Sequence, residues 1–328
     1  MDEATRRDFM VRAAVATGGL IAHGAAGEAL DASQASPPPA AARPPSKTAR
    51  LRALLKKPGI AMVPEAHSLF AARLAELNGF DAIYIGGNMM SAMYLGLEDW
   101  GLINTVELVE IAARIAGGVV VPAIVDADQG GETSLNVFRS IQAYERAGLA
   151  AFHIEDTRNP KHMGQGKSEL MPLAEMLLRI SAAVDARTDP DFLIIARSDC
   201  LILGPNVGQA DEAIRRGNAF AKAGADAFFC VGMRTDQIAR LAREVPIPLI
   251  ALNVPMPDLR DTGVKLAIHA VQIYQPAMKL YETMILELKE QGQFQRRDDR
   301  RLSPETAAKV MRTGEYQRLA EQWTTLRR

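Results

Sequence analysis

Three acidic residues follow two consecutive apolar runs of the chain. Asp126 and Asp128 come directly after the run 119–125, and Glu155 ends the next run, 151–155. If both runs are parallel strands, alternation sends Asp126 and Asp128 to the same side, with Glu155 on the adjacent strand. Converging carboxylates repel one another unless a hard cation such as Mg²⁺ lies among them. The spacing therefore predicts a metal site; the alternative is solvated loop carboxylates that cap helices.

A positive charge comes one apolar run later. Arg197 ends the run 192–197, and a guanidinium fork at that position suits a carboxylate or a phosphonate. An ion pair of Arg197 with Asp199 or Glu155 is the other interpretation. The residues alone leave both open.

The positioning of these side chains depends on the fold. From about Leu51 the chain alternates short apolar runs with amphipathic stretches, a pattern typical of βα units and a parallel sheet. Eight such units over about 250 residues match a (β/α)8 TIM-type barrel, whose active site lies at the carboxyl ends of its strands. A doubly wound sheet would normally carry a Gly-rich phosphate loop after the first strand, and Pro64 to Ser68 is not one. Residues 272–328 are predicted to be extra helices, polar in character, that could pack on a neighbouring subunit. The expected strands are 59–63, 81–85, 119–125, 151–155, 192–197, 225–231, 248–252 and 264–268.

The N-terminal segment resembles a twin-arginine export signal. Arg6 and Arg7 precede a Gly- and Ala-rich apolar stretch that is shorter than the roughly 20 residues of a membrane span. We therefore expect a signal region at 1–32, a Pro- and Ala-rich linker at 33–50, and the barrel with its helical extension at 51–328. This predicts a periplasmic protein without a stable membrane anchor. A cytoplasmic protein whose tail carries two arginines by chance is the alternative.

Charge and cysteine content exclude several partner classes. Lys and Arg number 38 against 39 Asp and Glu, so no basic field exists to gather nucleic acid. Cys200 and Cys230 are too few for a disulfide framework and are expected in the core. His67, His153 and His269 have no partner at ligand spacing and are expected to be structural. A small molecule is the predicted partner.

Taken in order, four motifs are similar to the isocitrate lyase and phosphoenolpyruvate mutase superfamily. The resemblance covers essentially the whole chain after the linker. It implies Mg²⁺, or Mn²⁺, held by Asp126, Asp128 and Glu155, a small 2-oxo carboxylate as substrate, and a metal-stabilised enolate. It also implies a barrel whose eighth helix swaps onto a neighbour in a homotetramer. The motifs are Asp99 after Tyr94 to Glu98, Asp126-x-Asp128-x-Gly130, Glu155-Asp156 followed by Pro160-Lys161, and Ala196 to Asp199.

The same resemblance assigns roles to further residues. Gly86 and Gly87 would hold the substrate carboxylate through backbone amides, with Gly86 in place of the usual serine. Asn253, after the seventh strand, would be another carboxylate ligand, alongside Arg197. Asp99, Lys161 and Arg197 are the predicted catalytic residues, and the loop 157–169 that carries Lys161 is expected to close over the substrate.

One departure from the family pattern separates the possible reactions. Lyases of the family carry a Lys-Lys/Arg-Cys-Gly-His loop, whereas this chain has Met163 at the cysteine position and Gln165 at the histidine position. A thioether cannot donate a proton, and the sequence from Asn136 to Thr157 looks closest to the oxaloacetate decarboxylase branch, whose members lack the cysteine.

The predicted function is therefore a Mg²⁺-dependent 2-oxo acid decarboxylase or carbon-carbon lyase with an oxaloacetate-like substrate. Water or His162 would supply the final proton. Three alternatives stay open: a methylisocitrate lyase-type enzyme, a phosphonopyruvate hydrolase or mutase, and an exported protein that binds 2-oxo acids without turnover.

Overall fold

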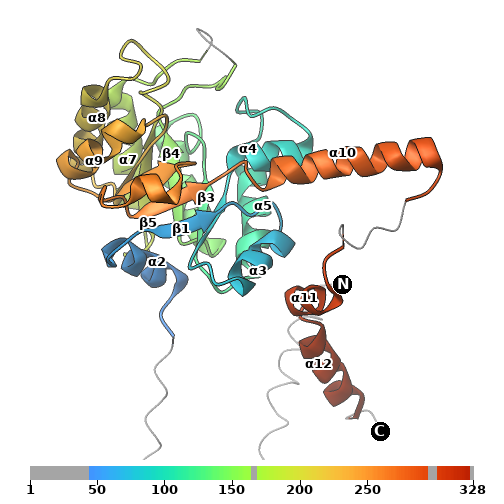
Figure 1. The fold of residues 1–328 in the computed structure, drawn as a ribbon. Helices are drawn as coiled ribbons and strands as arrows, with labels where there is room; N and C mark the ends of the chain where they lie inside the picture. Colours follow the sequence, from blue (N-terminus) through green and yellow to red (C-terminus); the bar gives the residue numbers. More distant parts are fainter. Residues whose placement is uncertain (1–43, 164–167, 295–300, 326–328) are drawn as a thin grey trace, which may run out of the picture. The chain divides into compact units, whose positions relative to one another are not determined.

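The computed structural model describes residues 44–163, 168–294 and 301–325 (Figure 1). The predicted export signal, most of the predicted linker and Gln165 lie outside the described residues, so these predictions stay predictions. Residues 45–328 group as one compact unit. Helix α2, Lys47–Lys56, begins inside the segment assigned to the linker. The reason is that the Ser46 hydroxyl accepts a hydrogen bond from the amide of Ala49 at 3.1 Å, which caps the helix.

Eight parallel strands form the sheet, and each overlaps one of the predicted runs. In the order β1-β8-β7-β6-β5-β4-β3-β2, every strand pairs in parallel with its neighbours. The ring closes where Glu65 forms a single bridge with Tyr84 and the amide of Ala66 donates to the Tyr84 carbonyl at 2.8 Å. The predicted (β/α)8 barrel is thereby confirmed. The strands are β1 Ala61–Pro64, β2 Ile83–Ile85, β3 Ala123–Asp126, β4 Ala151–Glu155, β5 Leu193–Ser198, β6 Ala227–Cys230, β7 Leu249–Leu252 and β8 Leu266–His269.

Helices alternate with the strands and bury one apolar face each. In α5, buried Leu108, Ile111, Ala112 and Ile115 recur at helical spacing. The Asn104 side chain caps α5 and is reciprocated by Glu107, as in a capping box. The elements between strands are α3 Leu69–Leu77, α4 Gly87–Met90, the π-helix η1 Ser91–Leu95, α5 Thr105–Ala116, α6 Ser134–Arg146, α7 Leu173–Ala186, α8 Ala210–Lys222, α9 Thr235–Glu244 and the 3-10 helix η2 Met256–Leu259.

Helix α2 packs against the strands at their amino ends. Its buried residues Leu51, Leu54 and Leu55 belong to the same core cluster as Leu193 at the start of β5 and Ile124 of β3. Figure 1 shows α2 beneath β1 and β5. The carboxyl ends of the strands, where the acidic residues lie, are thus left to the loops.

The described C-terminal residues, 272–294 and 301–325, contain the helices that were expected, α10 to α12, but the first of them is not polar. Of the 18 residues of α10, Tyr274–Gln291, only Tyr274 is buried. Exposed apolar side chains recur along it at Met278, Tyr281, Ile285 and Leu288. Helices α11, Pro304–Val310, and α12, Thr313–Thr325, follow. In the described part of the chain, no helix combines the length and the apolar character needed to cross a membrane.

Leu51→Ala should lower the free energy of unfolding by about 2–5 kcal/mol, because it removes a fully buried side chain and leaves a cavity. Chemical denaturation measures the change. Leu178→Ala, at a 64% exposed position of α7, is the matched control and should change stability by less than about 0.5 kcal/mol. Equal effects of the two substitutions would show that α2 is not part of the barrel core.

Candidate active site at the carboxyl ends of the strands

The strand register gathers the predicted acidic residues at one rim of the barrel. Asp126 ends β3, Glu155 ends β4, and Glu155 pairs in register with Arg197 of β5. Asp128 reaches the site differently from the prediction, because it lies beyond the end of β3 with a φ of 49° rather than on an alternating strand. Its amide donates to Asp126 Oδ1 at 3.0 Å, so a local turn positions it.

Lys161 lies at the centre of these carboxylates. Its Nζ is 2.5 Å from Asp128 Oδ1, 3.1 Å from Asp99 Oδ1 and 3.5 Å from Glu155 Oε1. The side chain is fully buried, which by itself disfavours its charge, but the carboxylates raise the pKa of Lys161 well above its ordinary value. Lys161 is therefore a buried cation that compensates the acidic residues, in close contact with the predicted ligands Asp128 and Glu155.

Arg197 adopts the ion-pair arrangement in the described structure. Its Nε and Nη2 donate to the two Asp199 carboxylate oxygens at 2.9 and 3.0 Å, and its Nη1 lies 2.9 Å from Glu155 Oε2. Burial opposes the charge, and Asp199 leads the contacts that raise the pKa of Arg197 well above its ordinary value. Its fork is thereby held rigidly at the rim, and a substrate contact through Arg197 stays a prediction.

His162 joins two of these acidic groups. Its Nδ1 lies 3.1 Å from Asp99 Oδ2, and its Nε2 lies 3.6 Å from Asp199 Oδ2. Asp199 and Asp99 raise the pKa of His162 to about 10, so the imidazole is protonated near neutral pH. The side chain is 31% exposed, and it is thus a positively charged proton donor between the site and solvent. Its link to Asp199 could not be predicted, because His162 has a φ of 56° that sequence spacing does not indicate.

His153, which was expected to be structural, lies beside the site, and its role stays a prediction. Its Nε2 lies 2.9 Å from the Tyr84 hydroxyl and its Nδ1 3.6 Å from Asp126 Oδ1. Burial lowers the pKa of His153 to about 4, so the ring is neutral, and its Nδ1 lies beside Asp126 without a hydrogen bond from the described residues. Its place two residues before Glu155 puts both on one face of β4. That spacing was the available signal for its position.

The predicted substrate-binding residues lie at the same end of the barrel. Gly86 and Gly87 follow β2, and the Gly87 amide donates to Asp126 Oδ2 at 3.2 Å. Asn253 follows β7 with a φ of 54°, and its Oδ1 accepts a hydrogen bond from the Ala270 amide at 3.0 Å. The Gly87 amide and the Asn253 side-chain oxygen are therefore engaged within the protein. Their predicted contact with a substrate is untested.

The side chains present fit a hard divalent cation in their chemistry. Asp99 Oδ1 and Glu155 Oε2 are buried and near a cationic side chain, yet accept no hydrogen bond from the described residues. Carboxylate oxygens of this kind are the donors that Mg²⁺ prefers. Within residues 44–163, 168–294 and 301–325, however, no three Asp, Glu, His or Cys side chains are arranged to hold a metal ion. We attribute this to Lys161, whose ammonium lies among the carboxylates.

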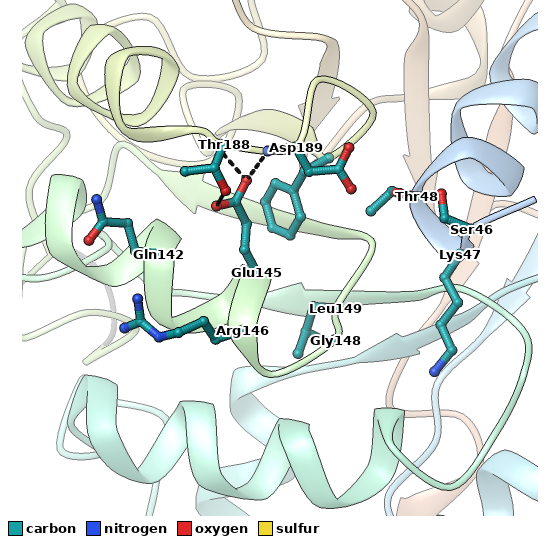
Figure 2. A pocket seen from close by; sticks show the side chains of 11 residues that line it. Ser46, Lys47, Thr48, Gln142, Glu145, Arg146, Gly148, Leu149, Thr188 and Asp189 are labelled. Carbon is teal, nitrogen blue, oxygen red and sulfur yellow. Dashed lines mark hydrogen bonds between the residues drawn. The ribbon is translucent and has the colours of Figure 1, made fainter. Parts of the chain in front are cut away.

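Two cavities distinguish the ends of the barrel. One of about 600 Å³ borders Asp128 and Gln129, beside the acidic site. Another, of about 670 Å³, lies at the amino ends of β4 and β5. Figure 2 shows the latter, where Glu145 accepts hydrogen bonds from Thr188 and from the amide of Asp189. These bonds join α6 to the segment before β5 at the end of a TIM barrel that serves stability rather than chemistry.

Comparison with known proteins gives a consistent result. A family model described as phosphoenolpyruvate phosphomutase matches residues 51–289. An oxaloacetate decarboxylase of Chromohalobacter salexigens is 38% identical over 237 residues, covering 70% of this chain and 80% of that protein. A 2,3-dimethylmalate lyase of Eubacterium barkeri is 35% identical over 239 residues, covering 71% and 81%.

Solved structures agree. The phosphoenolpyruvate phosphomutase of Streptomyces platensis subsp. rosaceus superposes with a TM-score of 0.77 and 31% identity over 84% of this chain and 99% of that one. A phosphonopyruvate hydrolase in complex with oxalate and Mg²⁺ gives 0.73 and 28% over 84% and 98%. The chain belongs to the phosphoenolpyruvate mutase/isocitrate lyase superfamily, as predicted. It is an enzyme of this superfamily, and the relatives named oxaloacetate decarboxylase and 2,3-dimethylmalate lyase support carbon-carbon lyase chemistry.

Lys161→Met should lower the free energy of unfolding by about 3–5 kcal/mol in metal-free buffer, because it leaves buried carboxylates without their cation. Mg²⁺ should then raise the unfolding temperature of the variant more than that of the wild type. Lys309→Met, which breaks the exposed pair with Glu305, is the control and should leave the free energy of unfolding nearly unchanged. An equal response of variant and wild type to Mg²⁺ would show that Lys161 does not share the cation position.

Proposed function

We propose that the protein is a Mg²⁺-dependent decarboxylase of a 2-oxo acid with oxaloacetate as the reference substrate. The observation that carries this proposal is the group of three carboxylates around Lys161, beside a loop in which Met163 replaces a proton-donating cysteine. The similarity to oxaloacetate decarboxylases supports the same reaction.

Asp126, Asp128 and Glu155 would hold Mg²⁺, or Mn²⁺, directly or through water. The bound ion would supply a Lewis acid that polarises the 2-oxo group. Because the Lys161 Nζ is only 2.5 Å from Asp128, it must move when a cation takes up that carboxylate. Lys161 would then lie near the substrate anion, where its charge stabilises the negative charge that develops in the transition state.

The missing cysteine is compatible with decarboxylation. Breaking the bond to the departing carboxylate releases carbon dioxide, which needs no proton, and leaves enolpyruvate, which needs one. We assign that proton to His162, which is protonated at neutral pH, is partly exposed and can regain a proton from solvent. Arg197, fixed by Asp199, would orient the substrate through its remaining donor capacity.

Wild-type protein with Mg²⁺ should release pyruvate from oxaloacetate faster than Mg²⁺ alone, and chelation should abolish the difference. Asp126→Ala should lose both Mg²⁺ binding, measured by calorimetry, and at least about 100-fold of turnover. Met163→Ala should stay within about threefold of the wild type, because a thioether supplies no proton.

Parallel assays with phosphonopyruvate and methylisocitrate test the alternatives. Faster release of pyruvate from phosphonopyruvate would identify carbon-phosphorus chemistry, and faster cleavage of methylisocitrate would identify a lyase with another acid. Binding of oxaloacetate without turnover of any of the three would support the exported binding protein.

We also propose that α10 packs on a second copy of the chain within a homotetramer. The support is the exposed apolar row Met278, Tyr281, Ile285 and Leu288, which recurs at the spacing of one helix face. Burying such a row against a partner would remove apolar surface from water.

Ile285→Glu should therefore lower the molar mass measured by light scattering after size exclusion, because it puts a charge into the proposed interface. Leu178→Glu, at a similarly exposed position of α7, is the matched control and should leave the mass unchanged. A wild-type chain that runs as a monomer would refute the assembly.

A further inference from the structure

Glu65 is a buried carboxyl group at the acidic rim, outside the set of predicted metal ligands and catalytic residues. It follows β1 directly, is 2% exposed, and closes the barrel through its bridge with Tyr84. Its Oε2 accepts a hydrogen bond from the Val271 amide at 2.6 Å. Its Oε1 is buried and has no hydrogen-bond partner among the described residues. A buried polar oxygen without a partner calls for an explanation, since most such atoms are paired.

The unpaired oxygen occupies the space that a side chain at position 86 would take. A Cβ built on Gly86 would lie 2.2 Å from Glu65 Oε1, far inside van der Waals contact. Gly86 therefore admits the Glu65 carboxyl to the rim, and any larger residue there would displace it. The two positions are physically coupled.

This part of the rim borders the predicted metal ligands. A Cβ on the adjoining Gly87 would lie 3.0 Å from Asp126 Oδ2 and 3.2 Å from Asp128 Oδ1. A small anion bound to a cation held by these carboxylates would therefore lie close to the backbone of Gly87. The Glu65 Oε1 is next to the adjoining Gly86.

We propose that Glu65 is a specificity-determining contact, whose protonated carboxyl donates a hydrogen bond to a carboxylate oxygen of the substrate. This inference rests on the proposed function, because it takes the substrate to be a small 2-oxo dicarboxylate. Glu65 thereby supplies the hydrogen-bond donor that Gly86, having no side chain, cannot supply.

The electrostatic setting favours the neutral form of this group. Burial, together with the negative charge of Asp126, raises the pKa of Glu65 to about 7, while the Val271 amide opposes the shift. Tyr84 and Tyr274 also interact electrostatically with Glu65, and the pKa of each phenol is raised, so both are neutral near pH 7. Burial is the largest cause of the shift at Glu65, and it disfavours ionisation of the carboxyl when a substrate covers the rim.

The test is calorimetric binding of oxalate, a small dicarboxylate, to the full-length protein in saturating Mg²⁺. Glu65→Gln keeps a neutral donor and the acceptor for Val271, so oxalate affinity should stay within about threefold. Glu65→Ala should weaken oxalate binding at least about tenfold, since it removes a hydrogen bond to a charged group. Glu65→Ala combined with Gly86→Ser should recover most of that loss, because the serine hydroxyl then has room at the rim.

Thermal unfolding without ligand separates the barrel-closing role of Glu65 from substrate contact. If Glu65→Ala does not fold, Gly86→Ala alone serves, because its Cβ must push the Glu65 oxygen aside without adding a hydroxyl, and it should weaken oxalate binding at least about threefold.

Each result bears on a definite claim. Wild-type affinity in folded Glu65→Ala, or in Gly86→Ala where that is the variant tested, overturns the Glu65 contact and leaves the proposed function intact. If Glu65→Gln and Glu65→Ala weaken oxalate binding equally, the claim that Glu65 acts as a neutral hydrogen-bond donor is wrong. If the double variant binds oxalate no more tightly than Glu65→Ala, the claim that Glu65 takes the place of a hydrogen-bond donor at position 86 is wrong. Wild-type protein that binds no oxalate in Mg²⁺ overturns the proposed function together with this inference.

Discussion

The concentration of buried negative charge at one rim of the barrel is the constraint on which the rest of the site depends. Asp99, Asp126, Asp128 and Glu155 are all nearly inaccessible to solvent, and charges held out of water are costly unless they are compensated. Lys161 and Arg197 supply that compensation by direct contact. The surrounding structure can be understood as the means of holding these opposite charges in register.

The barrel achieves this through its backbone. Parallel pairing sets Glu155 beside Arg197 and Asp126 beside His153. These side chains of neighbouring strands therefore lie at the same level along the barrel axis. The remaining groups come from loops, where Asp128 and His162 adopt positive φ angles to turn inwards. A rigid sheet thus fixes one half of the site, and locally strained turns complete the other half.

This division also explains how much the sequence could predict. The eight strands and the convergence of Asp126 and Glu155 followed from apolar runs and the geometry of parallel sheets. The direction of Asp128 was predicted for the wrong reason, because strand alternation does not extend past Asp126. The contacts of His162 and the place of Glu65 could not be inferred, since they depend on a turn conformation and on the closure between the first two strands. Both are long-range outcomes that no local pattern encodes.

That closure has a consequence for the motions of the barrel. Strand β1 is joined to β2 by one bridge, whereas β4 and β5 share five register pairs. Few backbone hydrogen bonds therefore have to break for the barrel to open locally between β1 and β2. An anion that contacts both Glu65, after β1, and Gly86, after β2, would join the two sides of this opening. Binding of the anion would then make local opening of the barrel less frequent. Hydrogen exchange of the Ala66 amide would slow as occupancy of the site increases.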